Sequence, residues 1–576
     1  MSWLFPLKNY KYSIPEGDHP GSFLKERKHH FHEGVDLYGK DGQEVYSVEN
    51  GTVHKILNFT GEKANSPWWN NTDAIIIKGS SGFVLYGEIK VNSKIKEGDC
   101  ISQGQLIGKI TPVLKKRKNN PIAMLHFEWY SKEVNNPIEL VKNKRNRDKT
   151  DSLYKEVKKY GLLDPTNKLK ESLNRKENIL LMICGSISAY KAPDIARGFI
   201  NNGQNVKVVL SKGAEHFVKK EVFDYLGIES YSSNDDFKNK NVLHIDLARW
   251  ADKVLIAPAS ANTIAKLSYG MADDLLSSIF LSLKKDVIKI ILPIMNTQML
   301  NQKVTQDNLK RLEFNYNLKI VKPDSGLLAC GEIGEGKLPN TESIVYITNL
   351  LTNNNKKNKE VVITAGATIA PIDSIRYVTN PAKGATGLLL AEKYLKEGYN
   401  VTVICNKNSL DKFKTLERHP NYKRVEVSTT RDLLNTVKKL SFDIYISTMA
   451  VSDLEFKNDG KKLKKKDLNV LKPNTAPDVL KYVLENKKNS HNIVVGFAAE
   501  TKLTKKVLDE KLSRKPVDLL VANEADGGFK NEKRKGFGTS HGVYKLISKR
   551  GIEDYSISKK DLVEKIYSNI KEIFEK

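Results

Sequence analysis

Cysteine is scarce in this sequence, and long hydrophobic runs are missing from it. The 576 residues include only four cysteines, and no two of them have the C-x-x-C spacing of metal and redox sites. Such sparse cysteine excludes a disulfide framework and is typical of a reducing compartment. No apolar segment is long enough to span a bilayer, and residues 1–18 lack the apolar core of a signal peptide. We therefore expect a cytoplasmic protein without membrane contact.

Acidic residues are too few to balance the basic ones. Lys and Arg number 94 against 68 Asp and Glu, which gives a formal net charge of +26. Such a charge raises the question of nucleic-acid binding. The lysines are spread along the chain, however, and no RNA- or DNA-binding motif accompanies them, so we expect no nucleic-acid partner. Anionic small substrates explain the charge equally well, and the chain length predicts roughly two to four domains.

The first 145 residues have the pattern of an all-β domain. Short runs that suit strands are separated by glycine and asparagine turns, namely EVYSVENGTVHKI, DAIIIKG and GFVLYGEI. The same segment contains His32, Asp36 and His126, whose two imidazoles and one carboxylate could bind a zinc ion and leave one coordination position open. The His-x-x-x-Asp spacing alone also fits two ordinary surface side chains.

The order of the motifs in this segment is more specific than any single motif. Along the chain it reads HEGVD, ENGTV, YG, KEGDCISQGQLIG and LHFE. This order resembles the lysostaphin-like zinc endopeptidases, and the resemblance implies Zn²⁺ ligands at His32, Asp36 and His126. That family uses two further histidines in catalysis, and the matching positions here are Glu88 and Met124. Because a methionine neither carries protons nor donates to an oxyanion, we expect a non-catalytic metal-binding module, although Glu88 leaves an altered hydrolase open.

A charged connector over residues 141–178 separates this domain from an α/β pattern. Strands and helices then alternate, which predicts a parallel, doubly wound, Rossmann-like sheet with ligands at the carboxyl ends of its strands. The expected strands are 179–184, 205–210, 253–257 and 288–292. The small-residue turn that begins at Gly185 suits a phosphate group at a helix N-terminus.

Four motifs in this pattern precede a glycine-rich stretch, LLACGEIGEGKL at 327–338. They are GSISAYK, HIDL, PASANT and PIMNTQM. In this order they resemble the flavin-dependent cysteine decarboxylases, specifically phosphopantothenoylcysteine decarboxylase, over a domain of residues 176–350. The resemblance implies FMN at Gly185, Ser186, Ser211, Ser260 and Asn262. It also implies His244 as the catalytic histidine, Asn296 as the contact of the substrate carboxylate, and Cys330 as the proton donor.

The chemistry of such a reaction explains these residue types. A plain α-amido carboxylate does not lose carbon dioxide readily, and oxidation of the neighbouring thiol to a thioaldehyde by flavin supplies the missing electron sink. The resulting ene-thiol must then be protonated and reduced, and the resemblance implies Cys330 as the proton donor. Three glycines make a helix or a central strand improbable for 327–338, so we expect a mobile loop that closes over the substrate. An ordinary glycine-rich turn is the alternative.

A second α/β pattern follows a polar linker at 352–359. Its expected strands are 360–364, 400–405, 443–447, 493–495 and 518–522, with helices at 388–397 and 560–576. The motifs ITAGAT, PIDSIRYVTN, AVSD, KLKK, GFAAET and DLLVAN resemble phosphopantothenate–cysteine ligase over a domain of residues 358–576. The resemblance implies CTP and Mg²⁺ as co-substrate and metal, with Asn380 and Lys462 at the acyl-nucleotide intermediate. Further nucleotide or Mg²⁺ contacts are implied at Gly366, Asp453, Phe497 and Asn523.

This last segment also departs from the pattern of the ligases. The ligases follow their asparagine with Ser-Ser-Gly-Lys-Met-Gly, whereas residues 381–387 read PAKGATG, and Ile369-Ala370 replaces a usual Arg-Glu pair. The loss of these hydroxyls and charges puts phosphate binding and the ligase rate in question. Lys383 is a candidate to replace the lysine of the ligase motif, which stands at a shifted position here.

Together the motifs predict a bifunctional enzyme of coenzyme A biosynthesis. It would join cysteine to phosphopantothenate with CTP and then decarboxylate the product to phosphopantetheine. Its expected partners are therefore small molecules. The resemblance further implies a homo-oligomer, with trimers of the flavoprotein domain and paired ligase domains that together make a dodecamer. Two alternatives remain, a peptidyl-cysteine decarboxylase and a regulatory binding protein with relic ligase and peptidase domains.

Overall fold

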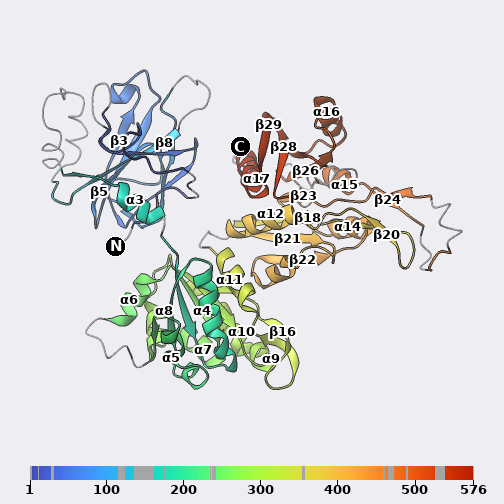
Figure 1. The fold of residues 1–576 in the computed structure, drawn as a ribbon, viewed down its shortest axis with the longest axis horizontal. Coiled ribbons are helices and arrows are strands. Elements are labelled where there is room, and N and C mark those ends of the chain that lie inside the picture. The colour runs from blue at the N-terminus through green and yellow to red at the C-terminus, as the bar shows by residue number, and fades with distance from the viewer. Residues whose placement is uncertain are drawn as a thin grey trace. The chain divides into compact units, whose positions relative to one another are not determined.

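The computed structural model has two compact units, residues 1–176 and 177–576 (Figure 1). The structure describes residues 3–8, 10, 12–26, 32–114, 123–134, 161–173, 175–233, 235, 242–352, 357–457, 461–464, 472–487, 489, 491–525 and 539–574. Within these ranges no helix combines the length and the apolar character that a membrane span requires.

The first unit is built on one antiparallel sheet. Its strands are β1 (Val35–Gly39), β2 (Glu44–Tyr46), β3 (Gly51–Thr60), β4 (Thr72–Gly79), β5 (Gly82–Val91), β6 (Cys100–Ile101), β7 (Leu106–Ile110), β8 (Ala123–Tyr130) and β9 (Leu162–Leu163). The order is β1-β8-β5-β4-β3-β6, with β7 paired to β2 and β5, and β9 paired to β8. The sequence therefore predicts the β character of this unit.

Both faces of this sheet are buried, which explains its continuous apolar runs. Ile75 and Ile77 of β4 belong to one buried cluster, whereas Ala74 and Ile76 of the same strand belong to a second cluster on the other face. Part of the expected connector also belongs to this unit. β9 extends the sheet, and Leu169 of α3 (Thr166–Leu173) is fully buried in the first cluster.

The second unit begins with a six-stranded parallel sheet. Its strands are β10 (Asn178–Ile183), β11 (Asn205–Leu210), β12 (Ser230–Tyr231), β13 (Lys253–Ala259), β14 (Ile288–Pro293) and β15 (Lys319–Ile320). The order β12-β11-β10-β13-β14-β15 places the first strand in the middle and reverses direction between β10 and β13. In open α/β sheets, ligands bind beside the carboxyl ends of the strands at such a reversal.

Helices cover both faces of this sheet. Buried residues of α4 (Ala192–Asn201) and α11 (Thr341–Leu350) pack with alternate residues of β10 on one face. Buried residues of α6 (Leu243–Trp250), α7 (Ala261–Ser268), α8 (Leu275–Ser282) and α10 (Lys303–Tyr316) pack with the other residues of β10. The shorter helices α5 (Lys220–Tyr225) and α9 (Thr297–Asn301) complete the segment.

A separate hairpin carries the glycine-rich stretch. β16 (Asp324–Leu327) and β17 (Ile333–Lys337) pair with each other, and residues 328–332 form the turn. We expected a loop over the whole of 327–338, whereas the structure pairs residues 327 and 333–337 as strand. The glycines permit close packing, because a Cβ on Gly336 would lie 2.0 Å from the Met295 carbonyl oxygen and φ at this residue is +124°.

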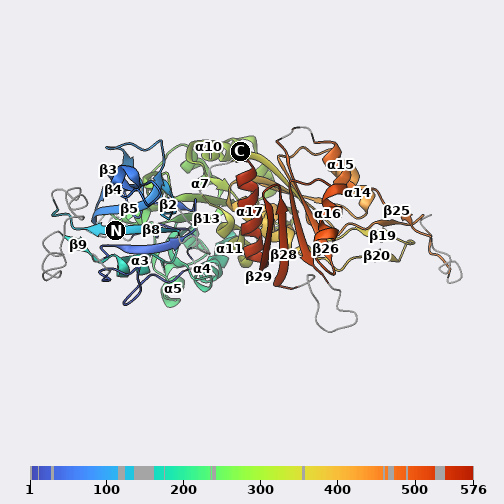
Figure 2. The same cartoon turned by 90° about the horizontal axis from the view of Figure 1, so that it is seen from above.

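The third sheet repeats the strand order of the second and adds two strands. Its members are β18 (Lys357–Ala365), β21 (Tyr399–Cys405), β22 (Tyr422–Glu426), β23 (Ile444–Ser447), β26 (Ile493–Glu500), β27 (Leu519–Glu524), β28 (His541–Ser548) and β29 (Gly551–Ser558). The order is β22-β21-β18-β23-β26-β27-β28-β29, parallel as far as β27 and antiparallel beyond it. Figure 2 shows α17 (Lys559–Phe574) alongside β28 and β29.

Helices cover both faces of this sheet as well. α12 (Ala385–Lys396) and α17 share one buried cluster with β18, and α14 (Thr430–Val437) and α15 (Val479–Glu485) share another cluster with its opposite face. The remaining elements are α13 (Lys412–Thr415), α16 (Lys505–Arg514) and the two-stranded sheets β19 (Ile369–Pro371)–β20 (Tyr377–Thr379) and β24 (Leu454–Glu455)–β25 (Asn474–Thr475). In outline the chain is the β unit followed by α/β sheets that the sequence predicts.

Candidate functional site

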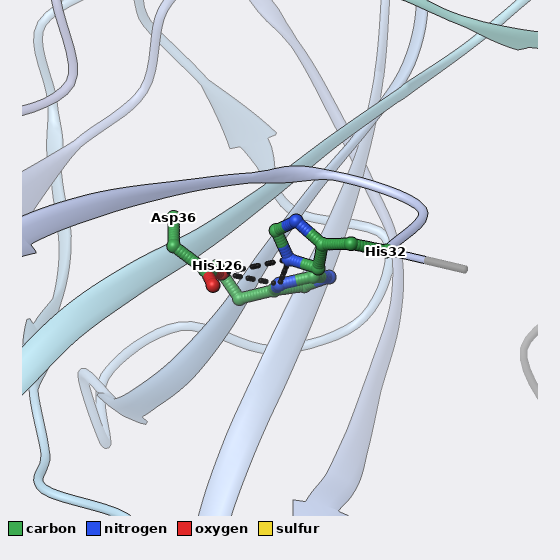
Figure 3. Close-up of side chains that lie close together, drawn as sticks. All are labelled: His32, Asp36 and His126. Atoms are coloured by element: carbon green, nitrogen blue, oxygen red, sulfur yellow. Dashed lines mark hydrogen bonds and ion pairs between the residues drawn. The ribbon is translucent and has the colours of Figure 1, made fainter. Parts of the chain in front are cut away.

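The three predicted metal ligands lie together in the first unit (Figure 3). Antiparallel pairing of β1 with β8 places Asp36 opposite His126, and His32 lies just before β1. The Asp36 Oδ1 atom is 3.0 Å from His32 Nε2 and 2.9 Å from His126 Nδ1, and the two nitrogens are 3.2 Å apart. All three side chains are buried.

Each histidine has a hydrogen-bond partner outside the cluster, and this partner determines which ring nitrogen presents its lone pair to the cluster. His32 Nδ1 lies 2.9 Å from the Ser22 carbonyl oxygen, and His126 Nε2 lies 2.8 Å from Glu128 Oε1. Because both oxygens are acceptors, each neutral imidazole carries its proton on the outer nitrogen. The inner lone pairs then point toward one another beside a carboxylate. This donor set fits a divalent cation such as Zn²⁺.

The electrostatics of the cluster agree with that fit. Burial alone would lower the pKa of His126, but hydrogen bonds with Asp36 and Glu128 outweigh it and raise that pKa to about 10. Burial alone would raise the pKa of Asp36, but hydrogen bonds with His126 and His32 outweigh it and hold that pKa well below its usual range. Without a metal ion, His126 therefore keeps an extra proton beside the ionised Asp36, and a metal ion that binds there would displace this proton.

The two positions that would carry catalytic histidines lie close to this cluster. Met124 is two residues before His126 on β8, so both side chains project from the same face of the strand. Glu88 follows Gly87, the partner of His126 across β5–β8, and its φ of 59° places it in the left-handed region. The structure thus places a thioether, rather than an imidazole, beside the ligand on β8.

The predicted cofactor residues follow neighbouring strands of the second sheet. Gly185 follows β10, Ser211 follows β11 and Ser260 follows β13, so these residues meet at one edge of the sheet. Ser260 caps α7 by accepting a hydrogen bond from the Thr263 amide at 3.4 Å, and this helix start carries Asn262. Ser186 directly follows Gly185.

The backbones of Gly185 and Gly213 lie in close contact at this edge, which explains the glycine at position 185. A Cβ on Gly185 would lie 3.1 Å from the Gly213 backbone, so a larger residue would force the two loops apart. Helix starts and small residues at the reversal point of an α/β sheet suit a phosphate-bearing cofactor. These residues therefore fit a bound FMN.

The predicted substrate and proton-donor residues meet at the hairpin. Asn296 follows β14, and its Oδ1 caps α9 by accepting from the Gln298 amide at 2.8 Å. Its Nδ2 then faces the hairpin turn, 3.4 Å from Cys330 Sγ and 2.9 Å from Glu332 Oε2. The Cys330 thiol lies 3.7 Å from the same Glu332 oxygen. Glu332 is a further member of this site, and the motifs predict no role for it.

The predicted catalytic histidine and two cysteines of this segment differ in their exposure to solvent. His244 lies near the start of α6, a separate element from the hairpin, and is partly buried. Cys184 is buried at the end of β10, and burial raises the pKa of its thiol to about 11. Cys330, in contrast, is exposed, as a group that reacts with a substrate must be.

The predicted nucleotide residues are distributed over several elements of the last segment. Gly366 directly follows β18 with φ of +85°, and a Cβ there would lie 2.3 Å from Ser409 Oγ. Gly384, in the altered stretch 381–387, packs against it, since its Cβ would lie 2.9 Å from the Gly366 nitrogen. Phe497 lies on β26 and Asn523 on β27. Asn380 and Asp453 are exposed and follow β20 and β23.

Lys462 lies in a segment fixed by an ion pair between the buried Asp373 and the partly exposed Arg376. The buried Asp373 carboxylate accepts from the Leu463 amide at 3.2 Å, and the Arg376 guanidinium donates to the Leu463 carbonyl oxygen at 2.9 Å. Arg376 also donates to Asp373 at 2.9 Å from its Nε, which holds the pKa of Asp373 well below its usual range. Both residues stand in the quoted PIDSIR motif, but only the structure shows that they fix the neighbour of Lys462.

Comparisons with known proteins match all three parts of the chain. Residues 30–138 match peptidase family M23, residues 167–353 match the flavoprotein family, and residues 356–574 match the DNA/pantothenate metabolism flavoprotein C-terminal domain. Among solved structures, a cysteine-to-serine variant of PPC decarboxylase complexed with pantothenoylaminoethenethiol is 32% identical with a TM-score of 0.29, covering 31% of this chain and 98% of that one. The FMN-binding protein AtHal3 is also 32% identical with a TM-score of 0.29, covering 31% and 96%.

Longer matches come from curated bacterial proteins. The coenzyme A biosynthesis bifunctional protein CoaBC of Bacillus subtilis (strain 168) is 35% identical over 387 residues, which are 65% of this chain and 91% of that protein. CoaBC of Borreliella burgdorferi is 32% identical over 410 residues, or 68% of this chain and 98% of that protein. CoaBC of Escherichia coli (strain K12) is 32% identical over 400 residues, or 67% and 94%. At this identity over nearly the full length of these relatives, the chain belongs to the family of the coenzyme A biosynthesis bifunctional protein CoaBC.

Proposed function

We propose that this enzyme catalyses two consecutive steps of coenzyme A biosynthesis. Its C-terminal segment joins cysteine to phosphopantothenate with CTP and Mg²⁺, and its flavoprotein segment decarboxylates the resulting phosphopantothenoylcysteine to phosphopantetheine with FMN. Membership in the CoaBC family supports both activities. The observation that carries the proposal is the meeting of the Asn296 amide with the Cys330 thiol at the hairpin turn.

Two residues at the hairpin have different roles in the decarboxylation: one binds the substrate and the other transfers a proton. Asn296 donates to the substrate carboxylate, and its cap on α9 fixes the direction of that donation before the substrate arrives. FMN, when bound, would accept two electrons from the substrate so that carbon dioxide can leave, and would return them after protonation so that the product is a thiol. Cys330, 3.4 Å from the same amide, is then close to the carbon that needs a proton. His244 acts at the thiol end of the substrate.

The ligase residues act on phosphate and acyl charge. Lys462 and Asn380 contact the acyl-cytidylate, and Gly366, Phe497 and Asn523 line the nucleotide position. Asp453 holds Mg²⁺. The altered residues 381–387 keep a structural tie to this edge, because the Lys383 carbonyl oxygen accepts from the Leu410 amide at 3.2 Å. The rate of CTP-dependent ligation measures the effect of these altered residues.

The first unit acts as a metal-binding module without peptidase activity. His32, Asp36 and His126 hold Zn²⁺, and Met124 leaves no proton carrier at its position. We further propose the domain ranges 1–145, 176–350 and 358–576, a cytoplasmic location, and a homo-oligomer of trimeric flavoprotein domains and paired ligase domains that forms a dodecamer.

One assay of the purified full chain tests the main proposal. The protein should show flavin absorbance, and phosphopantothenate, cysteine, CTP and Mg²⁺ should together yield phosphopantetheine and carbon dioxide. Pyrophosphate release from CTP that never depends on phosphopantothenate would contradict the ligase step. Phosphopantothenoylcysteine that is bound but never decarboxylated would contradict the flavoprotein step.

A further inference from the structure

Glu332 lies in the middle of the hairpin site although its side chain is exposed. One carboxylate oxygen, Oε2, is 2.9 Å from Asn296 Nδ2 and 3.7 Å from Cys330 Sγ. Solvent surrounds this turn, so burial does not force the contact. The carboxylate is therefore held by its two partners, which are the groups that would bind the substrate carboxylate and protonate the product.

The contact uses the donating side of the Asn296 amide. A side-chain amide has two donor hydrogens on nitrogen and one carbonyl oxygen. The oxygen is already committed, because it accepts from the Gln298 amide at 2.8 Å. Glu332 and Cys330 both lie within reach of the nitrogen. A substrate carboxylate reaches this donor only when Glu332 moves away, because two carboxylates repel each other at one small site.

The turn is free to make such a movement while the rest of the hairpin stays in place. Gly334 packs on Thr297, whose hydroxyl donates to the Glu335 carbonyl oxygen at 2.7 Å, so β17 is fixed to α9. The turn residues 328–332 are tied mainly to each other, and a Cβ on Gly331, where φ is +85°, would meet no other atom within 4 Å. Movement within the turn therefore displaces Glu332 and Cys330 together.

We propose that Glu332 is a positioning residue that occupies the carboxylate subsite at Asn296 and exchanges with the carboxylate of the substrate. This inference rests on the proposed function, in which Asn296 binds that carboxylate. The incoming substrate displaces Glu332 from the amide and opens the turn. Glu332 thus reports whether the subsite holds a carboxylate.

The exchange also orders the later steps. When the bond to the carboxylate breaks, its electron pair stays on the substrate and carbon dioxide leaves uncharged. Asn296 has then lost its anionic acceptor, and Glu332 returns to it. The same movement brings Cys330 back beside the amide, where its S–H proton passes to the substrate carbon. Solvent restores the thiol proton, since Cys330 is exposed.

The first experiment tests the contact without substrate. The full chain is treated with iodoacetamide, and alkylation of each cysteine is followed by peptide mass spectrometry. A neighbouring negative charge disfavours the reactive thiolate, so Glu332→Gln should speed Cys330 alkylation about three- to tenfold. The exposed Cys100 is an internal reference, and Glu335→Gln, three residues further along on β17, is the matched control. Equal Cys330 rates in all three proteins would overturn the contact.

The second experiment tests the exchange. Glu332→Gln offers Asn296 only a neutral acceptor, and such hydrogen bonds are roughly half as strong, so KM for phosphopantothenoylcysteine should fall about tenfold. Phosphopantetheine lacks the carboxylate, so its inhibition constant should stay within about twofold. The kcat should fall, because Cys330 is no longer drawn back to the amide. Glu335→Gln should leave all three values unchanged.

The possible results separate this inference from the proposed function. Parallel changes for the substrate and for phosphopantetheine would mean that Glu332 only shapes the turn, and would overturn the exchange. An unchanged KM would overturn it as well. If the wild-type protein never decarboxylates phosphopantothenoylcysteine while Cys330 alkylation responds to Glu332→Gln, the proposed function fails and the contact itself stands.

Discussion

At the scale of single residues, hydrogen bonds outside a site decide what the site can hold. The Ser22 carbonyl oxygen and the Glu128 carboxylate each accept a hydrogen bond from the outer ring nitrogen of a histidine. The inner nitrogens of His32 and His126 therefore face each other at a distance of 3.2 Å. Without a cation or an extra proton, this arrangement is repulsive. The ligand types were visible in the sequence, but the part played by Glu128 was not.

We expect the purified chain to contain about one Zn²⁺, because the inner nitrogens and Asp36 form a complete three-ligand set. His126→Ala should abolish metal binding, and Glu128→Gln should weaken it about 10- to 100-fold by releasing the ring that it orients. Metal analysis and competition with a chelator measure both effects. Glu97→Gln, a surface carboxylate, is the control. A chain that purifies without metal and does not bind added Zn²⁺ would rule out the site.

The methionine at position 124, where the peptidases have a catalytic histidine, leads to a second expectation for this unit. Peptide hydrolysis needs donors toward the developing oxyanion, and the loss of one donor alone costs on the order of a hundred- to a thousandfold in rate. Glycine-rich peptides should therefore remain uncut by the zinc-loaded chain, as judged by chromatography. Zinc-dependent cleavage that disappears in His126→Ala would show that the peptidase is active.

The exposed thiol at the hairpin carries the third expectation. Cys330→Ser should still release carbon dioxide but accumulate the unsaturated ene-thiol, because a hydroxyl at this position is a far weaker proton donor than a thiol. Product analysis by mass spectrometry measures the difference. Cys100→Ser, which changes the other exposed thiol, should form phosphopantetheine at the normal rate. Normal turnover by Cys330→Ser would remove the proton-donor role.

At the scale of elements, the fit of β17 on α9 positions the hairpin site. A Cβ on Gly334 would lie 2.2 Å from Thr297 Oγ1, directly after Asn296. Gly334→Ala should push the strand away and slow decarboxylation at least about tenfold, because misplacement by about 1 Å can cost a hundredfold. Thr297→Ala in the same chain removes the clashing oxygen and should restore part of the rate. The ligase activity of each variant is the control, and a double variant no faster than Gly334→Ala would exclude the clash as the cause.

A second element-level contact holds the segment of Lys462. Arg376→Ala removes the donor to the Leu463 carbonyl oxygen and leaves the buried Asp373 without its main partner. We expect CTP-dependent ligation to fall at least about tenfold, in line with the loss of a positioned charged group. FMN content and decarboxylation should stay unchanged. Arg431→Ala, which breaks an exposed ion pair with Glu455, is the control, and equal effects of the two variants would contradict a specific role.

At the scale of the whole molecule, the sequence predicts what depends on local pattern. β10, β11 and β18 are visible because buried parallel strands read as continuous apolar runs. The hairpin β28–β29 was not predicted, since β29 at the sheet edge is mostly exposed and carries no apolar alternation. Glu332 and Asp373 act through partners 36 and 90 residues away, and only the folded chain brings such partners together. The types of site residue came from resemblance to known families, whereas their contacts came from the structure.

The two α/β sheets of the second unit meet at a contact that includes a buried histidine. Arg418 forms an ion pair with Asp324 at the base of the hairpin β16–β17, and its carbonyl oxygen accepts from the Lys322 amide at 3.1 Å. The next residue, His419, is buried, and its Nδ1 accepts from the Asn421 amide at 3.2 Å. Burial, together with the positive charge of Lys319, lowers the pKa of His419 from 6.5 to about 3.

This shift sets an acid limit on the stability of the second unit. Below pH 6.5 His419 is protonated in the unfolded chain, whereas in the folded chain it stays neutral down to about pH 3. The free energy of unfolding therefore decreases as the pH falls from 6.5 to about 3. From about pH 7.5 to about pH 5.5 the loss from this group amounts to about 1.4 kcal/mol. His419→Asn keeps a hydrogen-bond acceptor but does not titrate. The decrease in the free energy of unfolding between the two pH values should therefore be smaller by about 1.4 kcal/mol in this variant, whatever the substitution itself costs in stability. Urea unfolding at both pH values, followed by pulse proteolysis of the second unit, measures the difference. The exposed His491, changed to Asn, should leave the decline unaltered, and an equal decline in wild type and His419→Asn would exclude His419 as its cause.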